Sequence, residues 1–273
     1  MSTSNRILKK EQPTAFSKQE KTPFLRLPFL LFLLTWCVWG KAQEPDTLPT
    51  LSLPEAFREG TPAFRALLPT DSVLQTEEFK FCGKPVDISP TDRQRKLKKE
   101  IVTILPSIKV WIERAQYYFP IIESILKSQQ VPEDFKYLMV IESGMNPHAR
   151  SYMGALGLWQ FMPATAREYG LNIDRGRDER TDIRKSTIAA CKYIKTAYAK
   201  FSDWIAVAQS YNIGQARIET ELHKQDVESI DLKLVKETER YIYRILAVKM
   251  LFTKPNGLGF DVDRIQYKKI RRR

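Results

Sequence analysis

Residues 132–143 read PEDFKYLMVIES, and this stretch decides the predicted fold. Apolar side chains recur at Phe135, Leu138 and Met139, the spacing that places residues on one face of an α-helix. The next position on that face is occupied by Glu142. A carboxylate is costly to bury in its ionised form unless it is paired. The stretch therefore predicts a helix on which Glu142 is neutral, paired with a cation, or open to a functional cleft.

The chain from residue 91 to residue 252 shows helical periodicity and no alternating strand pattern. Prolines 106 and 120 are expected to separate the first three helices, because proline breaks or kinks a helix interior. The tail at 260–270 is compatible with one short strand. The fold class expected is all-α. Helices are predicted at residues 92–105, 107–119, 120–128, 132–143, 163–170, 186–201, 204–211 and 238–252.

The first 42 residues have the pattern of an export signal. Six basic residues precede an apolar run at 27–40, which is shorter than the roughly 20 residues needed to span a bilayer. Gly40 and Ala42 supply the small residues of a cleavage site, so the mature chain is expected to begin at Gln43. An uncleaved signal anchor is the alternative left open. Lipidation at Cys37 is disfavoured by the preceding Trp36. The protein is therefore predicted to be exported to the periplasm, with membrane association left open.

The net charge of +12 is concentrated at the two ends of the chain. Residues 1–42 carry +5 and residues 261–273 carry +4, which leaves +3 for the body. The body lacks the basic, aromatic-interleaved stripe typical of nucleic-acid binding. The basic tail could contact anionic lipid or polymer, although a solvated end is the favoured interpretation. No nucleic-acid partner is predicted, and we expect a monomer.

Cysteine and histidine are scarce. Cys82 and Cys191 could pair in an oxidising compartment, or Cys191 could be a buried free thiol within an apolar helix. His148 and His223 are the only histidines. Without clustered thiols or imidazoles, the sequence predicts neither a metal site nor a cofactor.

Blocks from the end of the Glu142 helix onward carry a family resemblance. Over about residues 130–252 their ordered set resembles the catalytic domain of lytic transglycosylases, which has the goose-lysozyme-like fold of glycoside hydrolase family 23. The D-type membrane-bound subgroup is the most similar. The blocks are IESG at 141–144, GALGLWQFMPATA at 154–166, DERTD at 178–182, AQSYNIG at 208–214 and ETERY at 237–241.

The resemblance implies that Glu142 is a single catalytic acid/base acting on peptidoglycan. In this family the 6-hydroxyl of muramic acid attacks its own anomeric carbon, which gives a 1,6-anhydro sugar without consuming water. Desolvation on an apolar helix face agrees with this role, because it raises a carboxyl pKa. The alternative for Glu142 is a helix-end acid paired with Arg150 or Lys136. The charged cluster at 178–182 is interpreted as a structural ion-pair network.

The resemblance also implies substrate-binding roles for seven other residues. Gln160 could instead be a buried structural amide, and Met162 could be core filler. Asn212 could cap its helix, and Glu237 could act as an acid at a helix start. The implied substrate-binding residues are Ser151, Gln160, Met162, Tyr211, Asn212, Glu237 and Tyr241.

The sequence therefore predicts an exported enzyme that cleaves the MurNAc–GlcNAc β-1,4 bond. A hydrolytic lysozyme-type muramidase and a non-catalytic peptidoglycan-binding scaffold are the alternatives. The predicted organisation is a signal peptide at 1–42, an extended linker or wrapping arm at 43–90, a helical region at 91–130, the catalytic domain at 131–254 and a basic tail at 255–273.

Overall fold

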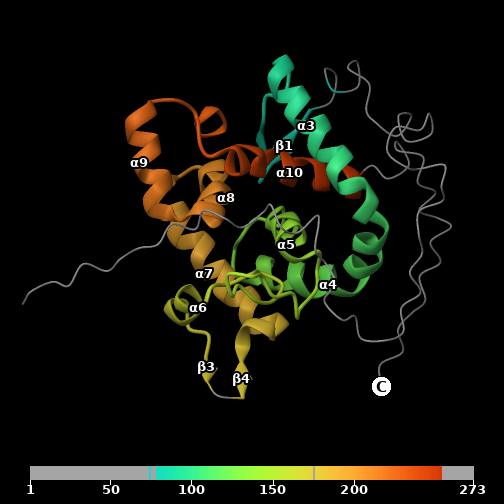
Figure 1. Cartoon of the computed structure of the whole chain (residues 1–273), viewed down its shortest axis with the longest axis vertical. Coiled ribbons are helices and arrows are strands. Elements are labelled where there is room, and N and C mark those ends of the chain that lie inside the picture. The colour runs from blue at the N-terminus through green and yellow to red at the C-terminus, as the bar shows by residue number, and fades with distance from the viewer. Residues whose placement is uncertain (1–73, 75–77, 175, 254–273) are drawn as a thin grey trace, which may run out of the picture.

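A computed structural model describes residue 74 and residues 78–174 and 176–253. The described part is mostly helical, which confirms the predicted all-α class (Figure 1). The predicted export signal, the tail strand and most of the 43–90 arm lie outside the described residues. No helix within the described ranges is long and apolar enough to cross a membrane.

The helices carrying the candidate site are packed around a central one. This is α5 (Phe135–Ser143), which begins three residues after Pro132. It packs against α4 (Ile108–Ser128) and α10 (Lys236–Thr253), and α10 in turn packs against α3 (Thr91–Ile104) (Figure 1). A short 3-10 turn, Leu105–Ser107, joins α3 to α4.

The second half of the domain is a chain of helices with defined caps. After α6 (Pro163–Glu168), Asp182 accepts a hydrogen bond from the Lys185 N–H and starts α7 (Ile183–Phe201). Asp203 likewise accepts from the Ala206 N–H at 2.9 Å and starts α8 (Trp204–Ile213), as its sequence position predicts. A polar helix, α9 (Gln215–Gln225), follows and precedes α10.

Two short antiparallel hairpins accompany the helices. One pairs β1 (Lys80–Phe81) with β2 (Lys84–Pro85), and the other pairs β3 (Ile173–Asp174) with β4 (Arg177–Asp178). The β3–β4 hairpin extends from the bottom of the domain in Figure 1. Strands this short have no alternation to detect, so the sequence did not reveal the hairpin at residues 173–178.

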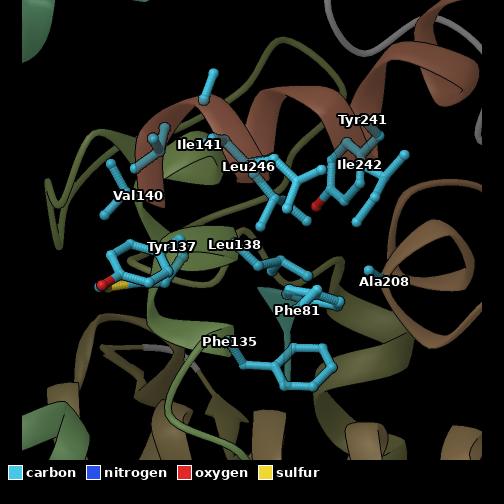
Figure 2. Close-up of a cluster of buried hydrophobic side chains, with 14 of the residues drawn as sticks. Phe81, Phe135, Tyr137, Leu138, Val140, Ile141, Ala208, Tyr241, Ile242 and Leu246 are labelled. Carbon is cyan, nitrogen blue, oxygen red and sulfur yellow. The ribbon is translucent and has the colours of Figure 1, made fainter. Parts of the chain in front are cut away.

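The core joins the N-terminal part of the described chain to the C-terminal helix. Phe81 of β1 is 1% exposed and contacts the ring of Phe135 edge-on, with the centroids 5.6 Å apart. Figure 2 shows Phe81 and Leu138 of α5 on one side of this cluster, with Ile242 and Leu246 of α10 on the other. The described residues before 91 are therefore part of the packed domain.

Two details of the predicted helices are wrong. The chain does not break at Pro120, because α4 runs continuously from Ile108 to Ser128. Pro120 is exposed, where water can replace the backbone hydrogen bond that proline cannot donate. The helix α9 was not predicted, because its sequence is polar and its buried side chains include Glu221 beside Ile218.

Both cysteines of the described region are free. Cys191 is buried in α7, as one of the two interpretations expects, and burial raises the pKa of its thiol to about 12.

The loop between α5 and α6 depends on glycine at one position. Gly157 has a φ of +88°, and a Cβ there would lie 2.0 Å from the carbonyl oxygen of Arg180. Gly154 has a nearly equal φ of +89°, but a Cβ added there would have no atom within 4 Å. The two residues therefore share a backbone conformation that favours glycine and differ in the space around them.

We expect Gly157→Ala to lower the free energy of unfolding by about 3 kcal/mol or more, because it adds a clash to the strain of positive φ. The matched variant Gly154→Ala should cost about 1 kcal/mol from strain alone. Urea denaturation of both variants measures the difference. Equal losses would contradict the close packing of Gly157 against Arg180.

Candidate functional site

Glu142 lies in the last turn of α5 and is partly exposed, between the buried residues Ile141 and Ser143. Its Oε1 accepts a hydrogen bond from the phenol of Tyr241 on α10. Tyr241 is 1% exposed, and its phenolic oxygen is visible at the upper right of Figure 2. Within the described residues, neither Arg150 nor Lys136 forms an ion pair with Glu142, and Lys136 binds Glu123 instead. The pairing considered as the alternative for Glu142 is therefore not observed.

Desolvation raises the pKa of Glu142 to about 7, and two groups on α10 oppose this rise. The Tyr241 phenol stabilises the carboxylate through its hydrogen bond, and the positive charge of Arg244 acts in the same direction. Burial and the neighbouring Glu142 also raise the pKa of Tyr241 well above its ordinary value, so that the phenol remains a donor. Glu142 can therefore hold or release a proton near neutral pH.

The end of α5 is fixed by Gly144 and by α4. Gly144 adopts a left-handed conformation with φ +57° and donates its N–H to the Val140 carbonyl, which closes the helix. The guanidinium of Arg114 donates to the Gly144 carbonyl at 2.9 Å. A Cβ at position 144 would lie 2.8 Å from Nε1 of Trp111. These contacts fix the end of α5, two residues after Glu142, and so the direction in which Glu142 projects.

The glycine-rich block is held by buried polar groups. The Gln160 amide donates at 2.8 Å to the carbonyls of both Ala149 and Gly157, in a backbone conformation with φ +47°. Gln160 is 6% exposed, so the structure places it as a loop-fixing amide, which is its structural alternative. The Ser151 hydroxyl accepts from the Ala155 N–H at 2.9 Å. Both residues therefore shape the loop beside α5.

Arg180, which follows β4 in the chain, also holds the glycine-rich block in place. It is 4% exposed and donates to the carbonyls of Gly154 at 2.7 Å and Phe161 at 2.9 Å. Its remaining donors bind both carboxylate oxygens of Asp178. This arrangement confirms the interpretation of residues 178–182 as a structural network. The role of Arg180 in fixing the loop was not predicted, because the loop carbonyls that it binds leave no sequence signal.

Tyr211 and Asn212, at the end of α8, face different partners. The Tyr211 phenol donates to the Trp159 carbonyl at 2.8 Å, and the nearby Glu142 contributes to raising its pKa. The Asn212 side-chain oxygen accepts from the buried hydroxyl of Thr238 at 2.7 Å and so joins α8 to α10. The helix is closed by Gly214, so Asn212 is not its cap.

Two of the predicted substrate-binding residues have partly exposed side chains that a ligand could reach. Met162 is partly exposed just before α6. Glu237 is partly exposed in the first turn of α10, and among the described residues its carboxylate has no hydrogen-bond or ion-pair partner. The structure thus brings Tyr241 into contact with Glu142 and places Tyr211 close by. For the other predicted residues it shows no contact with Glu142.

Comparison with known proteins finds a family match over part of this arrangement. Residues 119–233 match the family model of the transglycosylase SLT domain. Tyr241 and the whole of α3 lie outside the matched span.

The chain is 32% identical over 178 residues to membrane-bound lytic murein transglycosylase D of Escherichia coli K12, a match that covers 63% of this chain and 39% of that protein. It is 27% identical over 167 residues to membrane-bound lytic murein transglycosylase C of Histophilus somni 2336, covering 56% of this chain and 46% of the relative. The chain therefore spans less than half the length of these relatives.

One of the matching solved structures is the 70 kDa soluble lytic transglycosylase SLT70 of Escherichia coli. It has a TM-score of 0.46 and 21% identity, over 61% of this chain and 29% of that one.

We expect Tyr241→Phe to raise the pKa of Glu142 above about 7, because the lost phenol no longer stabilises the carboxylate. Carbon-13 NMR of labelled glutamate carboxyls measures this pKa, and the Glu142 signal is the one missing from Glu142→Gln. The matched variant Tyr211→Phe removes a phenol that binds Trp159 and should leave the pKa nearly unchanged. A fall in the pKa with Tyr241→Phe would contradict the observed hydrogen bond.

We also expect Glu142→Gln to be more stable than the wild type at alkaline pH. The pKa of Glu142 is about 7 when folded and 4.5 in an unperturbed chain, so the folded state binds the extra proton between these values. Stability from this group is full below about pH 4.5 and is lost as the pH rises through about 7. The advantage of the variant in free energy of unfolding should be about 2 kcal/mol at high pH. This is less than the full pKa shift implies, because the side chain is partly exposed and water screens it.

Urea denaturation at about pH 4 and about pH 8.5 measures this change. The two proteins should differ little at the acidic pH, where Glu142 is neutral in both the folded and the unfolded wild type. An advantage of the variant that is equal at both pH values would show that Glu142 is not held with a raised pKa.

Proposed function

We propose that this protein is an exported peptidoglycan lytic transglycosylase in which Glu142 is the single acid/base. The observation that carries the proposal is the environment of Glu142. Its side chain is partly exposed, its carboxyl is desolvated and has a pKa of about 7, and one carboxyl oxygen accepts a hydrogen bond from a phenol. A catalytic acid works best when its pKa lies near the operating pH. The match to the SLT domain and to lytic murein transglycosylases supports peptidoglycan as the substrate.

In the proposed reaction the protonated carboxyl of Glu142 donates to the glycosidic oxygen of a MurNAc–GlcNAc β-1,4 bond. The bond from the anomeric carbon to that oxygen breaks, and positive charge develops on the MurNAc ring. The Glu142 carboxylate then takes the proton of the MurNAc 6-hydroxyl. At the same time, the oxygen of that hydroxyl bonds to the anomeric carbon. The products are a GlcNAc end and a 1,6-anhydro-MurNAc end. The scheme consumes no water and needs no cofactor.

The surroundings of Glu142 favour one acid over two. Ordinary glycosidases place a second carboxylate about 5–9.5 Å from the first, either as nucleophile or as base for water. In the described part of the chain, the groups that shift the pKa of Glu142 besides its desolvation are the phenol of Tyr241 and the guanidinium of Arg244. A muramidase that hydrolyses the same bond would need such a second acid or a positioned water.

The other proposed residues divide into three groups. Tyr241, Tyr211 and Asn212 fix the acid and the helix ends around it, by the contacts described above. Glu237 and Met162 keep partly exposed side chains that can contact sugar. Ser151 and Gln160 act through the loop that they hold. Export to the periplasm and cell-wall association follow from the proposed substrate.

We expect Glu142→Gln to lower the rate of glycan cleavage by about 1,000-fold or more, because one residue serves as both acid and base. The purified protein and the variant are incubated with peptidoglycan, and the muropeptides are analysed by mass spectrometry. Anhydro-ended products from the wild type alone support the proposal.

The alternatives give different results in the same assay. Reducing-end products would show a hydrolytic muramidase. Binding to peptidoglycan without cleavage by the wild type would show a non-catalytic scaffold. Full activity in the variant would exclude Glu142 as the acid/base.

A further inference from the structure

A second glutamate, Glu100 of α3, is fully buried behind the candidate site. It has 0% exposure and lies 140 and 144 residues from its two partners in the chain. One carboxylate oxygen accepts from Nε of Arg240, and the other accepts from Nε of Arg244 at 2.8 Å. A buried charge requires such pairing, and guanidinium groups suit it because their donors are fixed in a plane.

The two arginines flank the residue that binds the catalytic acid. Arg240, Tyr241 and Arg244 lie within little more than one turn of α10. Tyr241 and Arg244 are three residues apart, so they project on neighbouring parts of the same helix face. Both act on Glu142, one by a hydrogen bond and the other by its charge. Arg240 shares the carboxylate of Glu100 but has no such effect on Glu142.

The groups around Glu142 come from several elements. The phenols of Tyr241 and Tyr211 approach it from α10 and α8. From α4, Arg114 is bound to the carbonyl of Gly144 and is thereby directed at the end of α5. Arg244 is the cation that supports the Glu142 carboxylate, and Glu100 is the anion that holds Arg244.

We propose that Glu100 is a positioning residue that holds Arg244 beside Glu142, so that α3 is part of the acid/base unit. The role in catalysis rests on the proposed function, in which Glu142 must become a carboxylate after it protonates the leaving oxygen. A fixed cation favours that charged state. Arg244 is 16% exposed, so without its buried partner it can turn toward water.

A direct electrostatic effect of the Glu100 charge on Glu142 makes a different prediction from a positioning role. If Glu100 acted on Glu142 only through its own negative charge, its neutralisation would lower the pKa of Glu142. If it acts by holding Arg244, its neutralisation releases the cation and raises that pKa. The sign of the change therefore distinguishes the two roles.

The test measures the pKa of Glu142 by carbon-13 NMR in the full-length protein. We expect Glu100→Gln and Arg244→Gln each to raise it by about 0.5. The double variant should show no further rise, because both changes remove the same interaction. Glu100→Asp keeps the charge but shortens the side chain by one methylene, so it should also raise the pKa. This variant keeps the test decisive if Glu100→Gln does not fold.

Arg240→Gln is the matched control, because it removes the same charge from the same carboxylate one turn earlier on α10. It should leave the pKa of Glu142 near the wild-type value. A fall or no change in the pKa with Glu100→Gln and Glu100→Asp would overturn the proposal, as would additive effects in the double variant.

Activity is measured separately, as the alkaline limit of anhydro-muropeptide formation against pH. That limit should move to higher pH in the same variants. A raised pKa in a protein that forms no anhydro product would support the positioning role and reject the proposed function. An unchanged pKa in a protein that does form the product would support the proposed function and reject the positioning role.

Discussion

The hydrogen bond from Tyr241 to Glu142 joins two helices through residues that lie 99 positions apart in the chain. For the bond to exist, the end of α5 and the first turns of α10 must each be held in one orientation. Gly144, packed against Trp111 and bound by Arg114, holds the first. The packing of α10 against α3 and the α5 core holds the second (Figures 1 and 2). Helix α3 and the first half of α4, which precede the matched span at residues 119–233, therefore contribute directly to the geometry of the site.

On the other side of the site, the glycine-rich block is fixed by one of its own side chains and by two from elsewhere in the chain. The two donors of the Gln160 amide and the buried guanidinium of Arg180 bind loop carbonyls that would otherwise be unpaired. A third side chain, that of Tyr211, donates to the carbonyl of Trp159. These side chains support the site through the backbone. A family motif therefore marks residues that build the site as well as residues that can contact a ligand.

The sequence predicts well those features that local patterns determine. The α5 stripe with Glu142 and the Asp203 cap arise from contacts within a few residues, and both were recognisable. The continuous α4 was missed because the effect of Pro120 depends on its exposure, which is a tertiary property. The polar α9 was missed because most of its residues face solvent. Glu100 appears in a basic amphipathic segment, and nothing near it indicates that its partners lie more than 100 residues away.

The balance of forces on Glu142 explains why a single acid can serve both halves of the proposed reaction. Desolvation alone would favour the neutral acid, which can donate a proton but is slow to yield the base. The phenol of Tyr241 and the charge of Arg244 favour the carboxylate and bring the pKa back to about 7. Near that pH the two forms have similar free energies, so neither the donation nor the return of the proton is strongly uphill. A fold that keeps one acid near this midpoint has less need of the second carboxylate that ordinary glycosidases use.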